Sequence, residues 1–381
     1  MKKILIISPS NEGTIAKCTA GIYTALRECE GVKVQMLSLY RFKKGESEFL
    51  DCDCIVDRTS DESNDLSLYQ KICFLKKYKS SFEPDTTVST LGAVSLLSAL
   101  SGGKDVKIGI FHAPRHQARE KGFLYYILTQ IMYFIIFPFL DRYYCVSKET
   151  EEDMKHIPTI PNNKIKVVYN IHNSERIIKL ASESLEANEV NLFQKLVLLY
   201  CGRLDENKAP IRAIDAFTRA KLQDANLVFI GPDPYQMWYE LEKKIPAEFK
   251  SRIFYLGSKQ NPYKYMSRSR MLVSTSYSEG LPGVLIESLL LGVPVVTTNS
   301  SQGNWEILSS HDKYNRKLSD FFVTDDGVIT SNLSFVNKEN YKIDIENLAK
   351  GMECVFNNQP KVSFHFKECI SKENIVTKYI N

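Results

Sequence analysis

Two glutamates in the last third of the chain are the first candidates for chemistry. Glu279 precedes the turn Gly280-Leu281-Pro282-Gly283, and Glu287 lies in the apolar run that starts at Val284. Proline suits the first turn of a helix, because its missing N–H would have no intrahelical partner there. The pattern therefore predicts Glu279 in a loop and Glu287 about two turns into the following helix.

The start of this predicted helix is suited to a phosphate. Free backbone N–H groups and a partial positive charge lie at a helix N-terminus, and both favour an anion. The alternative is that Glu279 and Glu287 are solvated side chains. That alternative fits Glu287 poorly, because it is flanked by Val284–Ile286 and Leu289–Leu291, where a carboxylate needs a hydrogen-bonding partner.

The Glu-Gly-Leu-Pro…Glu pattern, followed by Leu-Gly-Val-Pro-Val-Val at 291–296, resembles glycosyltransferase family 4. Members of this family are retaining enzymes with the GT-B fold that use sugar nucleotides. The resemblance implies that Glu287 holds the ribose hydroxyls and that Glu279 contacts the donor sugar. It also implies a set of donor-binding residues around the turn, which are Gly280, Leu281, Pro282, Gly283 and Val284.

A second charged motif follows the predicted strand 196–200. Arg203 and Lys208 lie in one strand-to-helix loop, where a guanidinium and an ammonium can bind a diphosphate and stabilise its charge as it leaves. The alternative is that Arg203 is paired with Asp205 in solvent. The loop resembles the family's Gly-Arg-Leu…Lys motif, which favours the catalytic role, although Ala209 stands where a glycine is common.

The first half of the chain offers weaker candidates. His112 follows the predicted strand 107–111 and resembles the family's histidine beside the donor sugar, although a single histidine can also be structural. The neighbouring Arg115 and His116 are interpreted as contacts to an acceptor phosphate. Gly13, in the first strand-to-helix turn, is expected to bring backbone N–H groups near the donor.

Three further residues of the second half belong to loops that resemble the family's donor site. The backbone of Phe254, at the end of a predicted strand, is expected to contact the nucleotide base. Gly303 follows the predicted strand 293–297 and is expected to approach the donor sugar. Glu306 is expected to serve the start of the next helix, where acidic residues are favoured.

No metal or other cofactor is expected. Asp51-Cys52-Asp53 spells the Asp-x-Asp of metal-dependent glycosyltransferases with a different fold. This is a three-residue match that no further ligand set accompanies, so we interpret it as structural. The nine cysteines lack zinc-type pairing.

Strand and helix patterns alternate along the whole chain, which is typical of an α/β architecture. With the resemblance, this predicts a GT-B fold in which two Rossmann-like domains face a cleft. The N-terminal domain, 1–172, would bind the acceptor and the C-terminal domain, 173–365, the nucleotide sugar. A helix within 366–381 would return to the first domain, and the polar segment 182–191 is expected to be a linker. Ligands are expected at the carboxyl ends of the strands.

Net charge and cysteine content bear on the class of binding partner and on the cellular compartment. The net charge of +4 is too small to suggest nucleic acid. The odd number of cysteines and the start Met-Lys-Lys-Ile-Leu-Ile-Ile, which is typical of a strand and not of a signal peptide, favour a cytoplasmic protein with reduced thiols.

An uncharged segment, 123–140, could be taken for a membrane span. Thr129-Gln130 and Pro138 interrupt it, which favours either a core helix or a helix whose outer face lies in the membrane interface. Arg115, Arg119 and Lys121 precede it and could meet anionic head groups. Tyr126 and Tyr133, which would share a helix face with Gln130, are expected to point outward.

These features predict a metal-independent, retaining hexosyltransferase. By the resemblance, it would move a sugar from a nucleoside-diphosphate sugar, with a UDP-sugar expected, to a glycan carried on polyprenyl diphosphate, at the inner face of the cell membrane. The whole resembles transferases of bacterial capsule and O-antigen assembly. The alternatives are a sugar-nucleotide 2-epimerase, which also has two Rossmann-like domains, and a non-catalytic nucleotide-sugar binder.

Overall fold

The structure is a computed structural model that describes residues 1–8, 13–38, 54–56, 67–90, 92–112, 114–115, 122–310 and 314–380. The chain divides into two compact units. Unit 1 comprises Met1–His172 with Glu368–Asn381, and unit 2 comprises Asn173–Lys367. The limits predicted from the sequence are 172/173 and 365/366.

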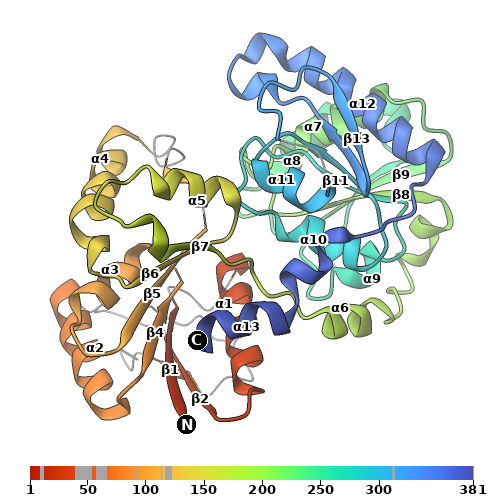
Figure 1. Cartoon of the computed structure of the whole chain (residues 1–381). Coiled ribbons are helices and arrows are strands. Elements are labelled where there is room, and N and C mark those ends of the chain that lie inside the picture. Colours follow the sequence, from red (N-terminus) through yellow and green to blue (C-terminus); the bar gives the residue numbers. More distant parts are fainter. Residues whose placement is uncertain are drawn as a thin grey trace. The chain divides into compact units, whose positions relative to one another are not determined.

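Unit 1 is built on a parallel sheet with the strand order β3-β2-β1-β4-β5-β6-β7 (Figure 1). The strands are β1 (Lys2–Ser8), β2 (Val32–Ser38), β3 (Cys54–Val56), β4 (Thr86–Ser89), β5 (Val106–Phe111), β6 (Arg142–Cys145) and β7 (Ile165–Val167). The order reverses between β1 and β4, as in Rossmann folds.

The helices of unit 1 cover both faces of this sheet (Figure 1). They are α1 (Gly13–Arg27), α2 (Leu68–Phe82), α3 (Gly92–Leu100), α4 (Phe123–Ile131), α5 (Lys148–Lys155) and α13 (Lys372–Ile380). The C-terminal helix α13 packs beside α1, and the Tyr144 hydroxyl donates to the Lys378 carbonyl at 2.5 Å. The end of the chain is therefore part of unit 1.

Unit 2 is built on a second sheet with the order β10-β9-β8-β11-β12-β14-β13. Its strands are β8 (Leu196–Cys201), β9 (Ala225–Ile230), β10 (Ile253–Tyr255), β11 (Met271–Ser274), β12 (Val295–Thr298), β13 (Phe321–Thr324) and β14 (Gly327–Thr330). Only β13 runs antiparallel to its neighbour among these strands. The β13–β14 hairpin was not predicted, because its short strands lack an extended apolar run.

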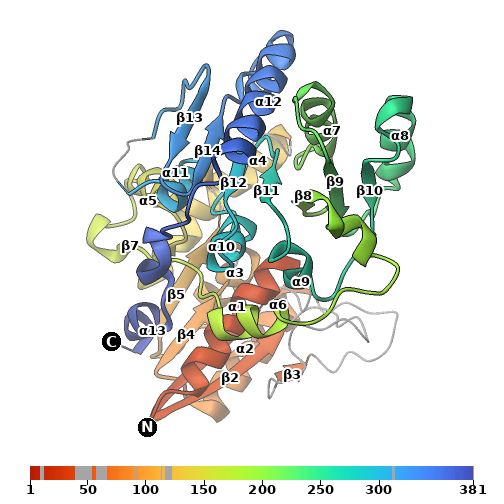
Figure 2. The same cartoon turned by 90° about the vertical axis from the view of Figure 1, so that its right-hand side faces the viewer.

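The helices of unit 2 are α6 (Ser174–Ala181), α7 (Pro210–Arg219), α8 (Met237–Lys244), α9 (Tyr263–Met266), α10 (Gly283–Leu290), α11 (Gln302–Leu308) and α12 (Tyr341–Asn358). Helices α7 and α12 contact each other and share one buried apolar cluster with the strands (Figure 2). The strand order reverses between β8 and β11, and ligands of such sheets bind at the carboxyl ends next to that point.

The prediction that residues 182–191 form a linker between the domains is wrong. Residues 182–191 belong to unit 2. Glu189, which is 5% exposed, accepts hydrogen bonds from Lys259 at 2.6 Å and from Tyr265 at 2.6 Å. Lys264 likewise donates to Glu186 at 2.9 Å. The polar composition of this segment thus reflects ion pairs with the body of unit 2.

The apolar segment 123–140 forms three short helical pieces, which are α4, a π-helical turn Met132–Ile136 and a 3₁₀ turn Phe137–Phe139. Its inner face packs in the core, where Phe137 is 0% exposed. Its outer face is exposed at Phe123 (79%), Leu124 (71%), Leu128 (53%), Ile135 (62%) and Phe139 (65%). Among the described residues, no helix is both long and apolar enough to cross a membrane.

The expectation that Tyr133 points outward is wrong. Tyr133 is 8% exposed, and its ring packs against Phe111 at 5.7 Å and Phe137 at 4.9 Å between centroids. Tyr126 is half-buried. The error arises because a segment that is apolar on every side carries no period from which its outer face can be read.

Candidate functional site

Unit 2 brings two of the predicted residues into direct contact. The Lys208 ammonium donates to Oε1 of Glu279, and the side chains are 28% and 14% exposed. Lys208 follows β8 and Glu279 follows β11, so the pair lies where the strand order of the sheet reverses. An ammonium and a carboxylate fixed together at this edge can bind a charged, hydroxyl-bearing ligand.

The loop that carries Lys208 is held by its own backbone contacts. The Asp205 carboxylate accepts the Lys208 N–H at 2.7 Å, and the Tyr200 hydroxyl donates to the Lys208 carbonyl at 3.2 Å. Ala209 has φ +45°, in the left-handed region that glycine adopts most readily. The chain therefore keeps, with an alanine, the backbone conformation that the family's common glycine would favour.

Arg203 lies in the same loop with a more exposed side chain, which is 57% exposed. Its guanidinium forms an ion pair with Asp205. The structure thus contains the exposed Arg203–Asp205 pair, which is the alternative to a catalytic role for Arg203. An exposed pair of this kind is weak, so a diphosphate could replace the carboxylate as the partner of Arg203.

Helix α10 begins immediately after the loop of Glu279. Gly283 is its first residue and Pro282 is the N-cap, with φ −75° and ψ 102°. Pro282 therefore lies one position before the first turn in which it was predicted. The Pro282 side chain makes no capping hydrogen bond to this helix start, and backbone N–H groups at a helix N-terminus can donate to an anion.

Glu287 lies on α10, as predicted, and has the hydrogen-bonding partner that its apolar surroundings demand. The Tyr263 hydroxyl, from α9, donates to Oε1 of Glu287 at 3.1 Å. Glu287 is half-buried among buried neighbours on its helix. Tyr263 was not predicted, because nothing in the sequence links it to a residue on another helix.

Glycines bring the strand ends of this edge close together. A Cβ added to Gly231 would lie 2.0 Å from the Gly202 carbonyl oxygen, and the Gly231 N–H donates to the Gly257 carbonyl at 3.0 Å. Phe254 lies on β10, the edge strand next to β9. Phe254 is the middle residue of this three-residue strand, and its contact with the nucleotide base stays a prediction.

Gly303 packs against the turn that precedes α10. A Cβ at Gly303 would lie 2.4 Å from the Gly280 carbonyl oxygen and 3.2 Å from Cα of Leu281. The space beside Gly303 is therefore filled by the chain itself. The role predicted for Glu306 is wrong, because α11 begins at Gln302 and has no acidic residue in its first turn.

A buried arginine that the sequence analysis missed anchors the Glu279 loop. Arg212 is 0% exposed and forms an ion pair with Asp344 at 3.3 Å. It also donates to Oδ1 of Asn332 at 2.7 Å, and its guanidinium lies 4.8 Å from the ring centroid of Tyr277. Asn332 in turn donates to the Tyr277 carbonyl at 2.8 Å. The residue two positions before Glu279 is thus fixed by a charge inside unit 2.

Replacing Arg212 by methionine is expected to lower the free energy of unfolding of unit 2 by about 3–5 kcal/mol, because Asp344 would remain charged and buried without its partner. Both tryptophans of the chain, Trp238 and Trp305, lie in unit 2. Urea unfolding followed by tryptophan fluorescence therefore reports on this unit. Arg219→Met, at an exposed position of the same helix, is the control, with an expected change within about 0.5 kcal/mol.

His112 of unit 1 has one hydrogen-bonded and one unpartnered ring nitrogen. Its ring is hydrogen-bonded to the Thr90 backbone, while Nε2 is shielded from solvent and has no partner among the described residues. Burial lowers the pKa of His112 to about 4, against a smaller opposing effect of the Thr90 bond. The ring is thus neutral at pH 7. With Nδ1 as the donor, its Nε2 is left to accept a hydrogen bond from a ligand hydroxyl.

Arg115 is occupied by contacts within unit 1. Its Nε pairs with Asp153 at 3.1 Å, its Nη1 donates to Gln130 at 3.2 Å, and its guanidinium lies 5.7 Å from the ring centroid of Tyr133. These contacts tie α4 to α5. His116, Arg119 and Lys121 lie outside the described residues. Gly13 is the first residue of α1, and residues 9–12 before it are also outside the described part of the chain.

The described residues contain no group of three or more His, Cys, Asp or Glu that could hold a metal ion. Asp51 and Asp53 lie outside the part of the chain that the structure describes.

Comparison with known proteins finds a family match within the second unit. Residues 183–321 match the family model of glycosyl transferases group 1. The resemblance stated from the sequence is confirmed over these residues. They contain Arg203, Lys208, Glu279 and Glu287, so all four lie in the matched region.

Two curated relatives are also glycosyltransferases by name. An uncharacterized glycosyltransferase of Methanocaldococcus jannaschii is 30% identical over 194 residues, which is 49% of this chain and 47% of that protein. A Campylobacter jejuni enzyme, N-acetylgalactosamine-N,N'-diacetylbacillosaminyl-diphospho-undecaprenol 4-alpha-N-acetylgalactosaminyltransferase, is 31% identical over 182 residues, or 48% of this chain and 47% of that enzyme. The chain thus matches about half the length of these curated relatives.

Solved structures confirm the fold over the whole chain. HepE of Anabaena, in complex with UDP and glucose, is similar with a TM-score of 0.69 at 14% identity, over 100% of this chain and 96% of that chain. At this identity the likeness concerns the fold alone. The predicted α/β class with two Rossmann-like domains of GT-B type is therefore correct.

Proposed function

We propose that the chain transfers a hexose, with retention of configuration, from a nucleoside-diphosphate sugar to a lipid-linked glycan. The observation that carries the proposal is the Lys208–Glu279 pair, where the strand order reverses and where the loop of Glu279 leads into α10. This arrangement offers cations and helix N–H groups to a diphosphate and a carboxylate to a sugar.

The residues of the proposed site divide between the diphosphate and the sugar. Lys208, Arg203 and the start of α10 hold the diphosphate, while Glu279 contacts the sugar. The bond between the anomeric carbon and the diphosphate oxygen breaks, and the acceptor oxygen forms a bond to the same carbon from the same side. The acceptor proton passes to the departing phosphate, so no separate protein base is needed. His112 accepts a hydrogen bond from a sugar hydroxyl through Nε2.

UDP is the proposed nucleotide and a polyprenyl-diphosphate glycan the proposed acceptor. Support for the first comes from the UDP bound in the Anabaena structure, and for the second from the diphospho-undecaprenol in the name of the Campylobacter relative. The exposed apolar side chains of α4 support contact with a membrane surface. We propose the cytoplasmic face of the cell membrane as the place of reaction.

The test is product analysis with labelled donors. The purified chain is incubated with a panel of nucleotide sugars and a short-chain polyprenyl-diphosphate glycan, and the products are separated and examined by NMR. Transfer with the donor's anomeric configuration is expected. An inverted linkage would refute retention, a donor epimerised at C2 would identify an epimerase, and unchanged donor that nevertheless binds would indicate a non-catalytic binder.

Glu287→Ala is expected to weaken nucleotide binding about tenfold or more, because hydrogen bonds between ribose hydroxyls and a carboxylate contribute about 1.5–3 kcal/mol. Calorimetric titration with UDP measures this change. Glu240→Ala, on the exposed surface of α8, serves as the control with unchanged affinity. Wild-type affinity in a folded Glu287→Ala variant would remove Glu287 from the nucleotide site.

Activity is expected to survive treatment with EDTA, because the proposed charge stabilisers at the diphosphate are Arg203, Lys208 and a helix start. The initial rate of sugar transfer is measured after chelation, with and without added Mn²⁺ or Mg²⁺. Complete loss that Mn²⁺ restores would contradict the proposal and would make Asp51 and Asp53 the first ligands to test.

A further inference from the structure

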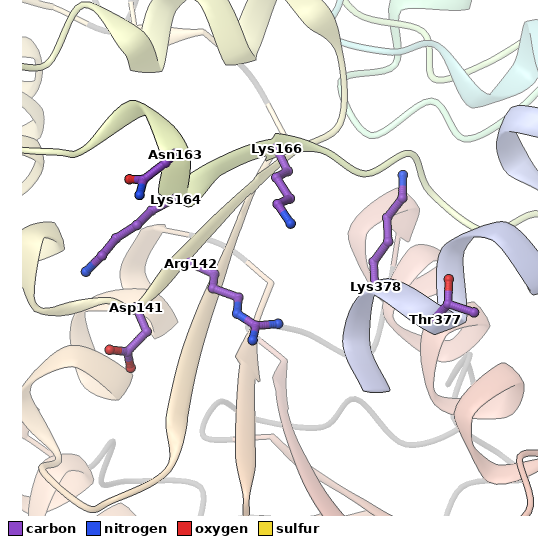
Figure 3. Close-up of a pocket in the computed structure, with 7 residues that line it drawn as sticks. All are labelled: Asp141, Arg142, Asn163, Lys164, Lys166, Thr377 and Lys378. Carbon is purple, nitrogen blue, oxygen red and sulfur yellow. The ribbon is translucent and has the colours of Figure 1, made fainter. Parts of the chain in front are cut away.

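Unit 1 contains a pocket of about 420 Å³ that none of the roles above uses (Figure 3). It lies at the start of β6 and β7 and beside the last turn of α13, with Arg142, Lys166 and Lys378 among its lining residues. His112 follows the end of β5, which runs parallel to β6. The pocket and His112 therefore lie at opposite ends of the strands, and the pocket is a separate feature.

The pocket has an excess of positive charge. Four of its side chains are cationic, which are those of Arg142, Lys164, Lys166 and Lys378, and only Asp141 is anionic. Asp141 accepts the backbone N–H of Lys107 at 2.8 Å. Within the described part of the chain, no carboxylate forms an ion pair with any of the three pocket lysines.

Internal contacts hold two of these cations in place. The Tyr144 hydroxyl donates to the Lys378 carbonyl at 2.5 Å and is also hydrogen-bonded to the Arg142 side chain. The Lys378 ammonium donates to the Val167 carbonyl at 3.2 Å. Two positive groups from distant parts of the sequence are thus positioned before any ligand arrives, which reduces the ordering cost of binding.

The positive charges of Lys166 and Lys378 repel each other, which favours binding of an anion in the pocket. Burial lowers the pKa of Lys378, Cys369 opposes this shift, and the positive charge of Lys166 adds to it. Lys166 of β7 and Lys378 of α13 line the pocket together with Arg142. In Figure 3 the Lys166 side chain extends toward the Arg142 guanidinium, while the Lys378 ammonium is directed toward β7. An anion bound between them would reduce their mutual repulsion.

The negative end of a helix dipole is the other explanation for nearby cations. At the end of α13 that role falls to Lys2, whose ammonium donates to the Ile380 carbonyl. The Lys378 ammonium is bonded instead to the strand β7. Lys166 lies on β7, and Lys164 ends the 3₁₀ turn just before it. The helix end therefore accounts for one lysine and not for the pocket.

We propose that this pocket binds a phosphate-type dianion, such as a diphosphate group, through Arg142, Lys166 and Lys378. A guanidinium can bind two phosphate oxygens at once, and ammonium groups add charge without a fixed direction. The volume suits a small molecule more than a single phosphate. The phosphate could come from a soluble diphosphate or from a lipid head group, which share this chemistry.

The test follows the reactivity of individual lysines in the full chain. The protein is acetylated briefly with and without inorganic pyrophosphate, and mass spectrometry quantifies each site. Pyrophosphate is expected to slow acetylation of Lys166 and Lys378 at least fivefold. Lys33 and Lys104, exposed lysines elsewhere in unit 1, should change less than twofold. Because the readout is local, binding of pyrophosphate near Lys208 does not affect it.

Two further arms identify the source and the residues. Vesicles of phosphatidylglycerol replace pyrophosphate in one arm, so protection by vesicles alone assigns a lipid head group and protection by pyrophosphate alone assigns a soluble ligand. In the other arm, Arg142→Gln should raise the pyrophosphate concentration for half-protection of Lys166 about tenfold. Equal reactivity with and without both probes would overturn the proposal, and so would equal protection by sodium chloride at matched ionic strength.

Discussion

Lys208→Ala should lower the turnover of sugar transfer about a hundredfold or more, which is the scale seen when a preorganised charge stabiliser is removed from a reacting group. The Lys208 ammonium would hold the leaving diphosphate while it also fixes Glu279, with which it is paired. Its loss would thus remove a positive charge and release the carboxylate. The measurement is the initial rate at saturating donor.

Arg203→Ala should have an effect of similar size, since the guanidinium is placed in the same loop. The double variant is expected to lose less than the product of the two single effects, because both cations would serve one diphosphate. Lys259→Ala is the matched control. Lys259 is also a lysine of unit 2 paired with a glutamate, and its side chain is 22% exposed against 28% for Lys208.

The control should keep a rate within about twofold of wild type, below the temperature at which either variant unfolds. A near-wild-type rate in Lys208→Ala would remove this loop from the diphosphate site. A loss shared equally by Lys259→Ala would show that stability of unit 2, and not leaving-group chemistry, is being measured.

Two of the predicted site residues lie in contact because the motifs that contain them follow strands. Lys208 comes after β8 and Glu279 after β11, and parallel neighbours in a sheet bring their carboxyl ends to the same edge. Two residues that are far apart in the sequence, Lys208 and Glu279, therefore come into contact. The strands themselves were predictable because buried parallel strands have continuous apolar runs.

The residues that support the site could not be predicted in the same way. Arg212 lies in the first turn of α7, where a charged side chain is usually solvated, and Asp344 is 132 positions further on. Tyr263 reaches Glu287 from a four-residue helix. Each partner is chosen by packing between distant segments, which no local pattern records.

Charged residues were difficult to interpret from the sequence, because a charged side chain can either bind a ligand or form an ion pair within the fold. Arg115 was assigned to an acceptor phosphate, but Asp153 and Gln130 bind its guanidinium within unit 1. The polar composition of 182–191 suggested a linker, although Glu189 is buried and bonded to Lys259 and Tyr265. In both cases composition revealed the charge, and only the fold revealed its partner.

Leu124→Asp and Leu128→Asp should each weaken binding to phosphatidylglycerol vesicles about tenfold or more, since full burial of a leucine side chain contributes about 1.5–3 kcal/mol. Leu124 is 71% exposed and Leu128 is 53% exposed, and they lie one helical turn apart on α4. They therefore form one outward face. An aspartate there would also be repelled by anionic head groups.

Co-sedimentation with vesicles at low salt measures this binding, and hydrolysis of the nucleotide sugar shows whether the variants remain folded and active. Leu68→Asp is the matched control, because Leu68 is 52% exposed on α2 of the same unit. Its binding should stay within about twofold of wild type, as should its hydrolysis. Tyr133→Asp should instead destabilise unit 1, because that ring is part of the core.

Salt separates the two contributions to membrane contact. High salt should weaken vesicle binding of the wild type by screening basic side chains, yet the contribution of the apolar face should persist. If the wild-type protein does not bind vesicles even at low salt, the exposed face of α4 has another partner. A water-soluble acceptor then becomes the better proposal. If Leu68→Asp releases the protein as readily as Leu124→Asp, binding does not depend on α4 and the assignment of that face is wrong.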